Sequence, residues 1–297
     1  MFRPQPPITW QRERLELADG DFLDLDWWRT GSNRRLIISH GLEGSSRRVY
    51  VTGLARAAAR RGWDVVAWNF RGCSGEPNRL PRSYHSGATE DLAAVVQHTA
   101  LRGEGTTALV GFSLGGNVTL KFLGEDQPAR ALVQAGVALS VPCDLKAAAL
   151  RMADSDCAFY MRRFLREMGR KMEAKRARFG RDFPAADWRS MRTFAEFDEA
   201  FTAPLHGFDS ADDYWARCSS VRFLSGIRVP TFILNAADDP FLAPACFPTE
   251  FARTSALVTL EVPSRGGHVG FVGAGRFSEE YWGEQRVLEF LEQALPK

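Results

Sequence analysis

The sequence is poor in cysteine, and the cysteines that it has follow no pattern. Five occur among 297 residues, an odd number without the close pairs that zinc sites use. They are Cys73, Cys143, Cys157, Cys218 and Cys246. This distribution favours reduced thiols over a disulfide framework and offers no metal site. No motif for an organic cofactor is present either, so we expect a protein that works without a metal or a cofactor.

A surplus of one charge and a long apolar run are also lacking. Lys and Arg number 38 and Asp and Glu 36, which leaves a formal net charge of +2. That balance argues against nucleic acid and against a globally acidic partner. Prolines occupy the N-terminus where a signal peptide would need apolar residues, and no stretch approaches the length of a membrane span. We therefore expect a cytoplasmic protein.

What the sequence does contain is a serine between two glycines, the segment Gly-Phe-Ser-Leu-Gly at residues 111–115. Residues 107–110 read as a buried strand, and residues 118–124 read as a helix that ends on a glycine. A chance match to three fixed positions rarely falls between a strand and a helix. Small neighbours let strand and helix pass on a strained turn that exposes the hydroxyl of Ser113. The pattern indicates a nucleophile elbow.

The remaining elements predict the fold class. Residues 12–17 and 21–27 alternate polar and apolar side chains around Asp19-Gly20, which predicts an antiparallel hairpin. Apolar runs predict further strands at residues 35–39, 64–68, 131–139, 229–235 and 257–262. Helical patterns cover residues 48–61, 89–101 and 279–295. Strands alternating with helices predict an α/β fold, with a mostly parallel central sheet and helices on both faces.

One segment interrupts this alternation. Residues 143–220 contain no strand pattern and are rich in helix-forming residues. The strands on both sides belong to one sheet, so we expect a core domain formed by residues 1–142 and 221–297. Residues 143–220 are then a helical cap inserted into that core.

A histidine and a carboxylate follow predicted strands further along the chain. A serine hydroxyl becomes a good nucleophile when a histidine takes its proton and a carboxylate orients that histidine. Asp238 and Asp239 follow residues 229–235, and His268 follows residues 257–262. Loops at the carboxyl ends of parallel strands converge over the sheet, so these groups can meet Ser113. Alternatively, the aspartates only form a turn before a proline, and the histidine is structural.

The loop after residues 35–39 has a different expected role. Its glycines at positions 41 and 44 let the backbone approach a substrate closely. We expect the backbone N–H of Leu42 to donate to a developing oxyanion, together with the N–H of Leu114 after the nucleophile. A plain glycine turn is the alternative interpretation.

Four segments carry a resemblance to a known family. They are HGLEGSS at residues 40–46, NFRGCSGEPNRLPRSYHSG at 69–87, VGFSLGGN at 110–117 and NAADDPF at 235–241. Together they resemble the YheT-like α/β-hydrolases, a group related to the yeast medium-chain ethanol acyltransferases and to plant and animal relatives. The order Ser, Asp, His is also that of the α/β-hydrolases. The resemblance implies Ser113 as nucleophile, His268 as base and Asp238, rather than Asp239, as the acid.

The function that follows is ester cleavage. We expect a serine hydrolase that forms an acyl-enzyme on Ser113 and acts on carboxylic esters of short to medium acyl chains. An acyltransferase or thioesterase with the same triad is an alternative. A non-catalytic lipid-binding protein that kept the fold is another, although such a protein has no need of a strained serine.

The predicted cap bears on the substrate. Between residues 160 and 192 there are eleven Lys and Arg residues but only four Asp and Glu residues. Met161, Phe164, Leu165, Met168 and Met172 recur at helical spacing, so one side of a helix is apolar and the rest is basic. A solvated helix seated on the core explains this pattern. A lid that touches an anionic membrane or an acidic head group also explains it, with the phenylalanines of the cap lining an acyl pocket.

Overall fold

The central sheet has eight strands. The computed structural model describes residues 8–273 and 279–295. The strands, in their order across the sheet, are β1 (Gln11–Glu16), β2 (Phe22–Trp28), β4 (Asp64–Asn69), β3 (Arg34–Ser39), β5 (Thr106–Phe112), β6 (Ala135–Leu139), β7 (Thr231–Leu234) and β8 (Val258–Glu261). Strand β2 pairs antiparallel with β1 and β4, and the other pairs are parallel. The predicted hairpin and mostly parallel sheet are confirmed.

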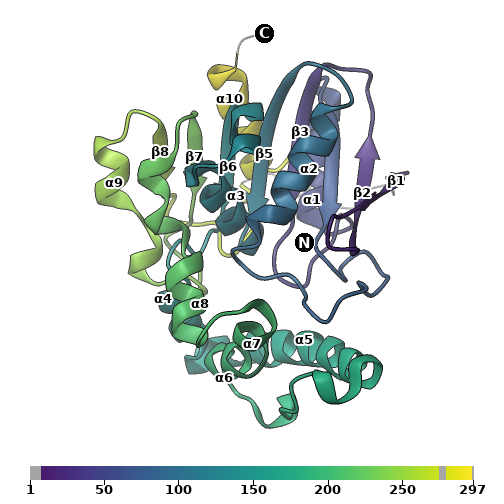
Figure 1. The fold of residues 1–297 in the computed structure, drawn as a ribbon. Helices are drawn as coiled ribbons and strands as arrows, with labels where there is room; N and C mark the ends of the chain where they lie inside the picture. The colour runs from purple at the N-terminus through teal and green to yellow at the C-terminus, as the bar shows by residue number, and fades with distance from the viewer. Residues whose placement is uncertain (1–7, 274–278, 296–297) are drawn as a thin grey trace.

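Helices cover both faces of the sheet (Figure 1). They are α1 (Val49–Arg60) and α10 (Trp282–Ala294) on one face, and α2 (Thr89–Ala100) and α3 (Leu114–Gly124) on the other. Side chains alternate along each strand, so Leu36 and Ile38 pack with α1 and α10 while Ile37 packs with α2 and α3. Both faces are therefore buried, which explains the unbroken apolar runs.

Apart from shifts of a few residues at other element ends, the structure differs from the sequence prediction in one strand and in one additional helix. The strand predicted at residues 131–139 begins only at Ala135, because Pro128–Leu132 forms a 3₁₀ turn that starts on a proline. Helix α9 (Thr249–Thr254) was not predicted. This helix has six residues, and its sequence has no apolar periodicity that would predict a helix. Neither difference moves a loop at the carboxyl ends of the strands.

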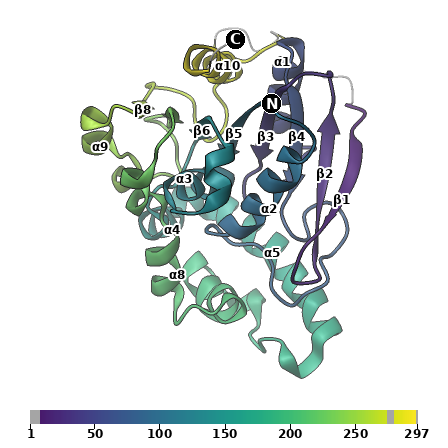
Figure 2. The same ribbon diagram turned by 45° about the horizontal axis from the view of Figure 1, so that its top comes forward.

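Five α-helices lie between β6 and β7, and we call residues 143–220 the cap segment. They are α4 (Leu145–Met152), α5 (Ala158–Phe179), α6 (Phe194–Phe197), α7 (Ala203–His206) and α8 (Ala211–Cys218). Figures 1 and 2 show them as a layer beyond one end of the strands, below the sheet in Figure 1. Met161, Leu165 and Met172 of α5 are buried against the phenylalanines of α6 and its neighbours. That the cap segment forms a domain of its own stays a prediction.

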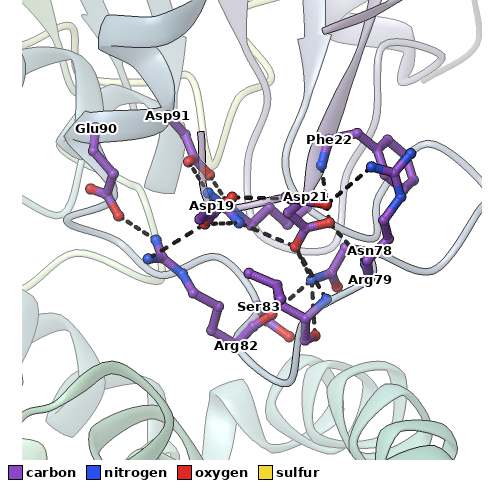
Figure 3. A network of polar contacts seen from close by, with 12 residues as sticks. Asp19, Asp21, Phe22, Asn78, Arg79, Arg82, Ser83, Glu90 and Asp91 are labelled. Atoms are coloured by element: carbon purple, nitrogen blue, oxygen red, sulfur yellow. Dashed lines mark hydrogen bonds and ion pairs between the residues drawn. The ribbon is translucent and has the colours of Figure 1, made fainter. Parts of the chain in front are cut away.

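A buried ionic network joins the hairpin turn, the loop after β4 and helix α2 (Figure 3). The guanidinium of Arg71 donates to both carboxylate oxygens of Asp91, at 2.8 and 2.6 Å, and to Asp19 at 2.8 Å and Asp21 at 3.1 Å. Burial raises the pKa of Asp91 despite its ion pair with Arg71. The pKa of Asp21 is lowered overall. Burial alone would raise it, but hydrogen bonds donated to the carboxylate, led by that from Asn78, outweigh the burial. These charges are stable in the interior because they compensate one another.

The same loop holds the cap segment. Lys175 of α5 is buried, and its Nζ donates to Oδ1 of Asn78 at 2.7 Å. It also donates to the carbonyl oxygens of Leu80 at 2.7 Å and Arg82 at 3.0 Å. Burial lowers the pKa of Lys175 to about 8. Helix α5 is thereby attached to the polar loop that follows β4.

Replacing Arg71 should expose how much this network stabilises the fold. Arg71→Ala leaves Asp91 buried without a cation, so we expect a loss of about 3–5 kcal/mol in the free energy of unfolding. The pKa of Asp91 is raised in the folded state and rises further without Arg71. The folded variant then binds an extra proton at low pH, so its deficit should shrink as the pH falls. Urea unfolding at several pH values measures both effects.

Arg253→Ala is the matched control, because the Arg253 and Glu250 side chains that pair there are largely exposed. Its loss should stay below about 1 kcal/mol. A similar small loss for Arg71→Ala would contradict the stabilising role of the network.

Candidate active site

Ser113 occupies a sharp turn between β5 and α3. Its φ of +53° is unusual for a residue with a side chain. A Cβ at Gly111 would collide with the backbone of Gly115, and a Cβ at Gly115 would collide with the carbonyl oxygens of Ser39 and His40. Both glycines are therefore required by close packing. The turn places the serine hydroxyl at the carboxyl edge of the sheet.

His268 joins this serine to a carboxylate. Its Nε2 lies 2.9 Å from Oγ of Ser113, and its Nδ1 lies 2.9 Å from Oδ2 and 3.1 Å from Oδ1 of Asp239. A carboxylate only accepts, so Nδ1–H donates to Asp239 and Nε2 is left to accept from the serine hydroxyl. Three loops that are far apart in the sequence thus form one hydrogen-bonded chain.

The preference for Asp238 as the partner of His268 is corrected by this geometry. Asp239 is buried, whereas Asp238 is exposed. The buried carboxylate of Asp239 is the one within hydrogen-bond distance of the His268 ring. Oδ1 of Asp238 instead accepts the backbone N–H of Gly267 at 2.7 Å. Asp238 therefore supports the loop that carries His268.

The histidine is held from two further sides. The Phe241 ring lies 4.4 Å from the His268 ring, measured between ring centroids. The N–H of Phe241 donates to Oδ1 of Asp239 at 3.0 Å, which fixes the carboxylate. Val269, which follows the histidine, donates its N–H to Oγ of Ser140 at 2.8 Å. Residues at the ends of β6, β7 and β8 together orient the imidazole.

The loop after β3 is fixed by a second, buried histidine. Nδ1 of His40 lies 2.8 Å from the carbonyl oxygen of Gly41, and Nε2 accepts the N–H of Phe70 at 3.2 Å. Burial lowers the pKa of His40 to about 3, so the ring is neutral. The N–H of Gly41 donates to the Tyr50 hydroxyl at 3.0 Å. His40 thus holds the loop and is occupied on both nitrogens.

This arrangement places two backbone donors beside the serine. Gly41 packs so closely on Ser113 that a Cβ there would lie 3.3 Å from the serine Cβ. The next residue, Leu42, and the first residue of α3, Leu114, line a cavity together with Ser113. Neither of their N–H groups has an acceptor among the residues that the structure describes. Both predicted oxyanion donors therefore border the space in front of the serine.

A cap residue that sequence reasoning missed also contacts this loop. Nζ of Lys171 on α5 lies 2.8 Å from Oε2 and 3.0 Å from Oε1 of Glu43. Tyr84 accepts the N–H of Glu43 at 2.8 Å and donates to its carboxylate at 2.7 Å. Glu43 has a φ of +51°, so these contacts hold a strained residue next to Leu42. No sequence pattern indicates this pairing, because Lys171 is one of many basic residues in the cap segment.

Ser113 and His268 open into a cavity of about 160 Å³ between the core loops and the cap segment. Most of its wall is apolar. Phe194, Phe197 and Phe201 of the cap segment line it, whereas Phe179, Phe183 and Phe208 do not. Phe159, by contrast, is exposed on the surface.

The cavity also has a polar part. Asp198, in a π-helical turn at Asp198–Thr202, accepts from the Thr202 hydroxyl at 2.6 Å and from Nε1 of Trp215 at 2.9 Å. Burial raises the pKa of Asp198 to about 6. The Asp198 side chain joins α6 to α8 and helps to shape the inner wall.

The described residues contain neither a cluster of metal ligands nor a membrane-spanning helix. Across residues 8–273 and 279–295, no group of three or more His, Cys, Asp or Glu side chains is placed to hold a metal ion. Every helix in these ranges is too short or too polar to cross a bilayer. All five cysteines are buried and free. Burial raises the pKa of Cys73 to about 11, so its thiol stays protonated near neutral pH.

Comparisons with known sequences identify the family. Residues 34–274 match the family described as alpha/beta hydrolase fold. The chain is 38% identical to the YheT protein of Escherichia coli strain K12, which is named as an esterase, over 98% of this chain and 87% of that protein. It is 28% identical to the mouse phospholipase ABHD3, over 90% of this chain and 68% of that protein.

Solved structures share the same fold. An esterase of Pyrococcus furiosus, Pf2001, superposes with a TM-score of 0.65 at 19% identity, covering 99% of this chain and 97% of that one. The alpha/beta hydrolase GrgF of a Penicillium species has a TM-score of 0.67 at 17% identity, covering 97% and 99%. With its fold, its serine elbow and these relatives established, the chain belongs to the α/β-hydrolase family, in the group of esterase-type hydrolases that includes YheT.

Proposed function

We propose that this protein is a serine hydrolase that cleaves carboxylic esters through an acyl-enzyme on Ser113. The observation that carries the proposal is the unbroken hydrogen-bonded chain from Ser113 through His268 to Asp239. Ser113, at one end of this chain, faces an apolar cavity large enough for a small acyl group. The ester-cleaving relatives support the same substrate class.

The proposed reaction follows from the hydrogen bonds. Oγ of Ser113 attacks the ester carbonyl carbon while Nε2 of His268 takes the hydroxyl proton. The buried carboxylate of Asp239 keeps the ring in the required tautomer and stabilises the imidazolium that forms. His268 then returns the proton to the leaving alcohol. Water, activated by the same histidine, releases the acid from Ser113.

Charge on the carbonyl oxygen needs donors that are already in place. The N–H groups of Leu42 and Leu114 border the serine, and Leu114 also begins α3, where the helix dipole favours a negative charge. We assign them as the oxyanion hole. Glu43, Tyr84 and Lys171 would act through Leu42, by fixing the loop that presents its N–H.

The substrate chain would lie among the aromatic residues of the cap segment. Phe194, Phe197 and Phe201 provide an apolar wall without charge, which suits an alkyl chain. A cavity of this size accommodates a group about as large as benzene, which supports short to medium acyl chains.

A fluorophosphonate probe and p-nitrophenyl butyrate test the proposed function directly. The wild-type protein should be labelled covalently and should hydrolyse the ester. Ser113→Ala should not be labelled, and its kcat should fall by roughly 10⁵–10⁶-fold, because Ser113 is the only described residue whose hydroxyl is hydrogen-bonded to His268. Adding ethanol and measuring ethyl butyrate distinguishes acyl transfer from hydrolysis. A labelled Ser113→Ala variant, or an unreactive wild-type protein that is folded, would refute the proposal.

The two neighbouring aspartates provide a matched pair. Asp239→Asn places an amide opposite Nδ1 and favours the wrong tautomer of His268, so kcat should fall by about 10⁴-fold. Asp238→Asn keeps an oxygen that can accept from Gly267, so kcat should change by less than about tenfold. Steady-state kinetics with p-nitrophenyl butyrate measures both. The reverse order of effects would return the acid role to Asp238.

Lys171 should act as a positioning residue. Lys171→Met removes the cation that holds Glu43, so kcat should fall about tenfold with KM little changed. Lys171→Arg should recover much of the loss, because a guanidinium also pairs with a carboxylate. Lys146→Met is the control, since Lys146 pairs with Asp212 on the surface. A rise in KM alone would instead indicate that Lys171 binds the substrate.

A further inference from the structure

Three large apolar side chains are exposed close together in the sequence, where the cap segment begins. Leu150 at the end of α4 is 56% exposed, and Phe159 and Tyr160 at the start of α5 are 68% and 42% exposed. Exposing an aromatic ring to water forfeits the free energy that its burial would provide. The rings of Phe159 and Tyr160 are in contact, and we call these two residues the apolar patch.

The apolar patch leads to the catalytic histidine through successive ring contacts. The centroids of Phe159 and Tyr160 are 5.6 Å apart, those of Tyr160 and Phe241 are 4.9 Å apart, and those of Phe241 and His268 are 4.4 Å apart. Phe241 also lines the cavity. The patch therefore lies on the surface next to the catalytic site, separated from it by a wall of aromatic rings.

A row of arginines continues from Phe159 along the outer face of α5. Arg163, Arg166 and Arg170 follow Phe159 by four, seven and eleven positions, which places all four residues on one side of a helix. All four are exposed. Arg163 pairs with Glu167, but Arg166 and Arg170 form no ion pair with any carboxylate of the described residues. We call the three arginines the basic stripe.

The opposite face of α5 is fixed. Met161, Leu165 and Met172 are buried in the cap segment, and Lys175 is anchored in the core loop after β4. The helix cannot turn over without losing these contacts. Phe159 and the basic stripe, which share the other face, consequently point away from the protein.

We propose that the apolar patch and the basic stripe bind the surface of an anionic lipid aggregate. Aromatic side chains beside arginines suit the interface of an anionic bilayer, with the rings at the acyl boundary and the guanidinium groups at the phosphates. This surface would present an amphiphilic ester to the neighbouring catalytic site, and to that extent the proposal rests on the proposed function. A helix that is merely solvated would explain the arginines but not the exposed Phe159.

Vesicle sedimentation tests the proposal without any need for catalysis. The Ser113→Ala variant is used as the parent, so that lipid is not consumed. Vesicles of phosphatidylcholine are compared with vesicles that also contain phosphatidylglycerol. The parent should sediment with the anionic vesicles, and high salt should release a large part of it, because exposed charges are screened. No sedimentation with anionic vesicles would overturn the proposal.

Variants on the surface separate the two contributions. Phe159→Ala should weaken the partition coefficient roughly tenfold, through the apolar area that no longer enters the bilayer. Arg166→Gln and Arg170→Gln should each weaken it about fivefold. Leu101→Ala and Arg253→Gln are matched controls, since both side chains are exposed and lie outside the cap segment. Equal binding by all variants, or equal losses in the controls, would contradict the assignment.

Activity and self-association complete the test. In the protein with Ser113 intact, Phe159→Ala should leave the hydrolysis of soluble p-nitrophenyl butyrate unchanged, since Phe159 does not line the cavity. Vesicle binding by a protein that hydrolyses no ester would refute the proposed function alone. Self-association that Phe159→Ala abolishes, without vesicle binding, would assign the patch to a second copy of the chain and overturn the lipid proposal.

Discussion

The close approach of two backbone segments at the serine elbow is the constraint on which the site depends. Gly115 packs against the carbonyl oxygens of Ser39 and His40 so tightly that no side chain fits between them. Strands β3 and β5 are adjacent and parallel, so their carboxyl ends bring the serine and the loop after β3 to one point. The strained turn at Ser113 and the predicted oxyanion donors thus result from a single packing contact.

The loop after β3 is held from the core and from the cap segment at once. His40 and Tyr50 fix its start through the backbone of Gly41, and Tyr84 fixes Glu43. Lys171 of α5 pairs with the same glutamate, so an ion pair links the cap helix to the loop beside the serine. Burial strengthens this ion pair relative to a surface pair, because less water screens it. The cap segment therefore contacts the loop beside the serine and also lines the cavity.

Sequence patterns predicted the sheet and the serine and histidine positions, because each leaves a local signal. Apolar runs marked the strands, and close packing at the elbow permits only glycine at positions 111 and 115. The choice between Asp238 and Asp239 had no such signal, since a one-residue difference in the turn decides which carboxylate is buried. The contacts of Arg71 with Asp19 and Asp91 could not be predicted either. They join residues 52 and 20 positions apart, and no periodicity records such pairs.

The basic character of α5 illustrates why composition alone could not assign a role to the cap. Two pairs of its basic residues have different surroundings. Lys171 and Lys175, one turn apart, point toward the core, where a carboxylate and three amide or carbonyl oxygens neutralise or solvate them. Arg166 and Arg170 lie on the outer face beside solvent. Lysine suits the first set, because a compact ammonium fits a cage of oxygens, and arginine suits the second, because its planar group pairs with phosphate. Basic residues of one helix therefore lie in two different environments, and the direction of each side chain decides which environment it enters.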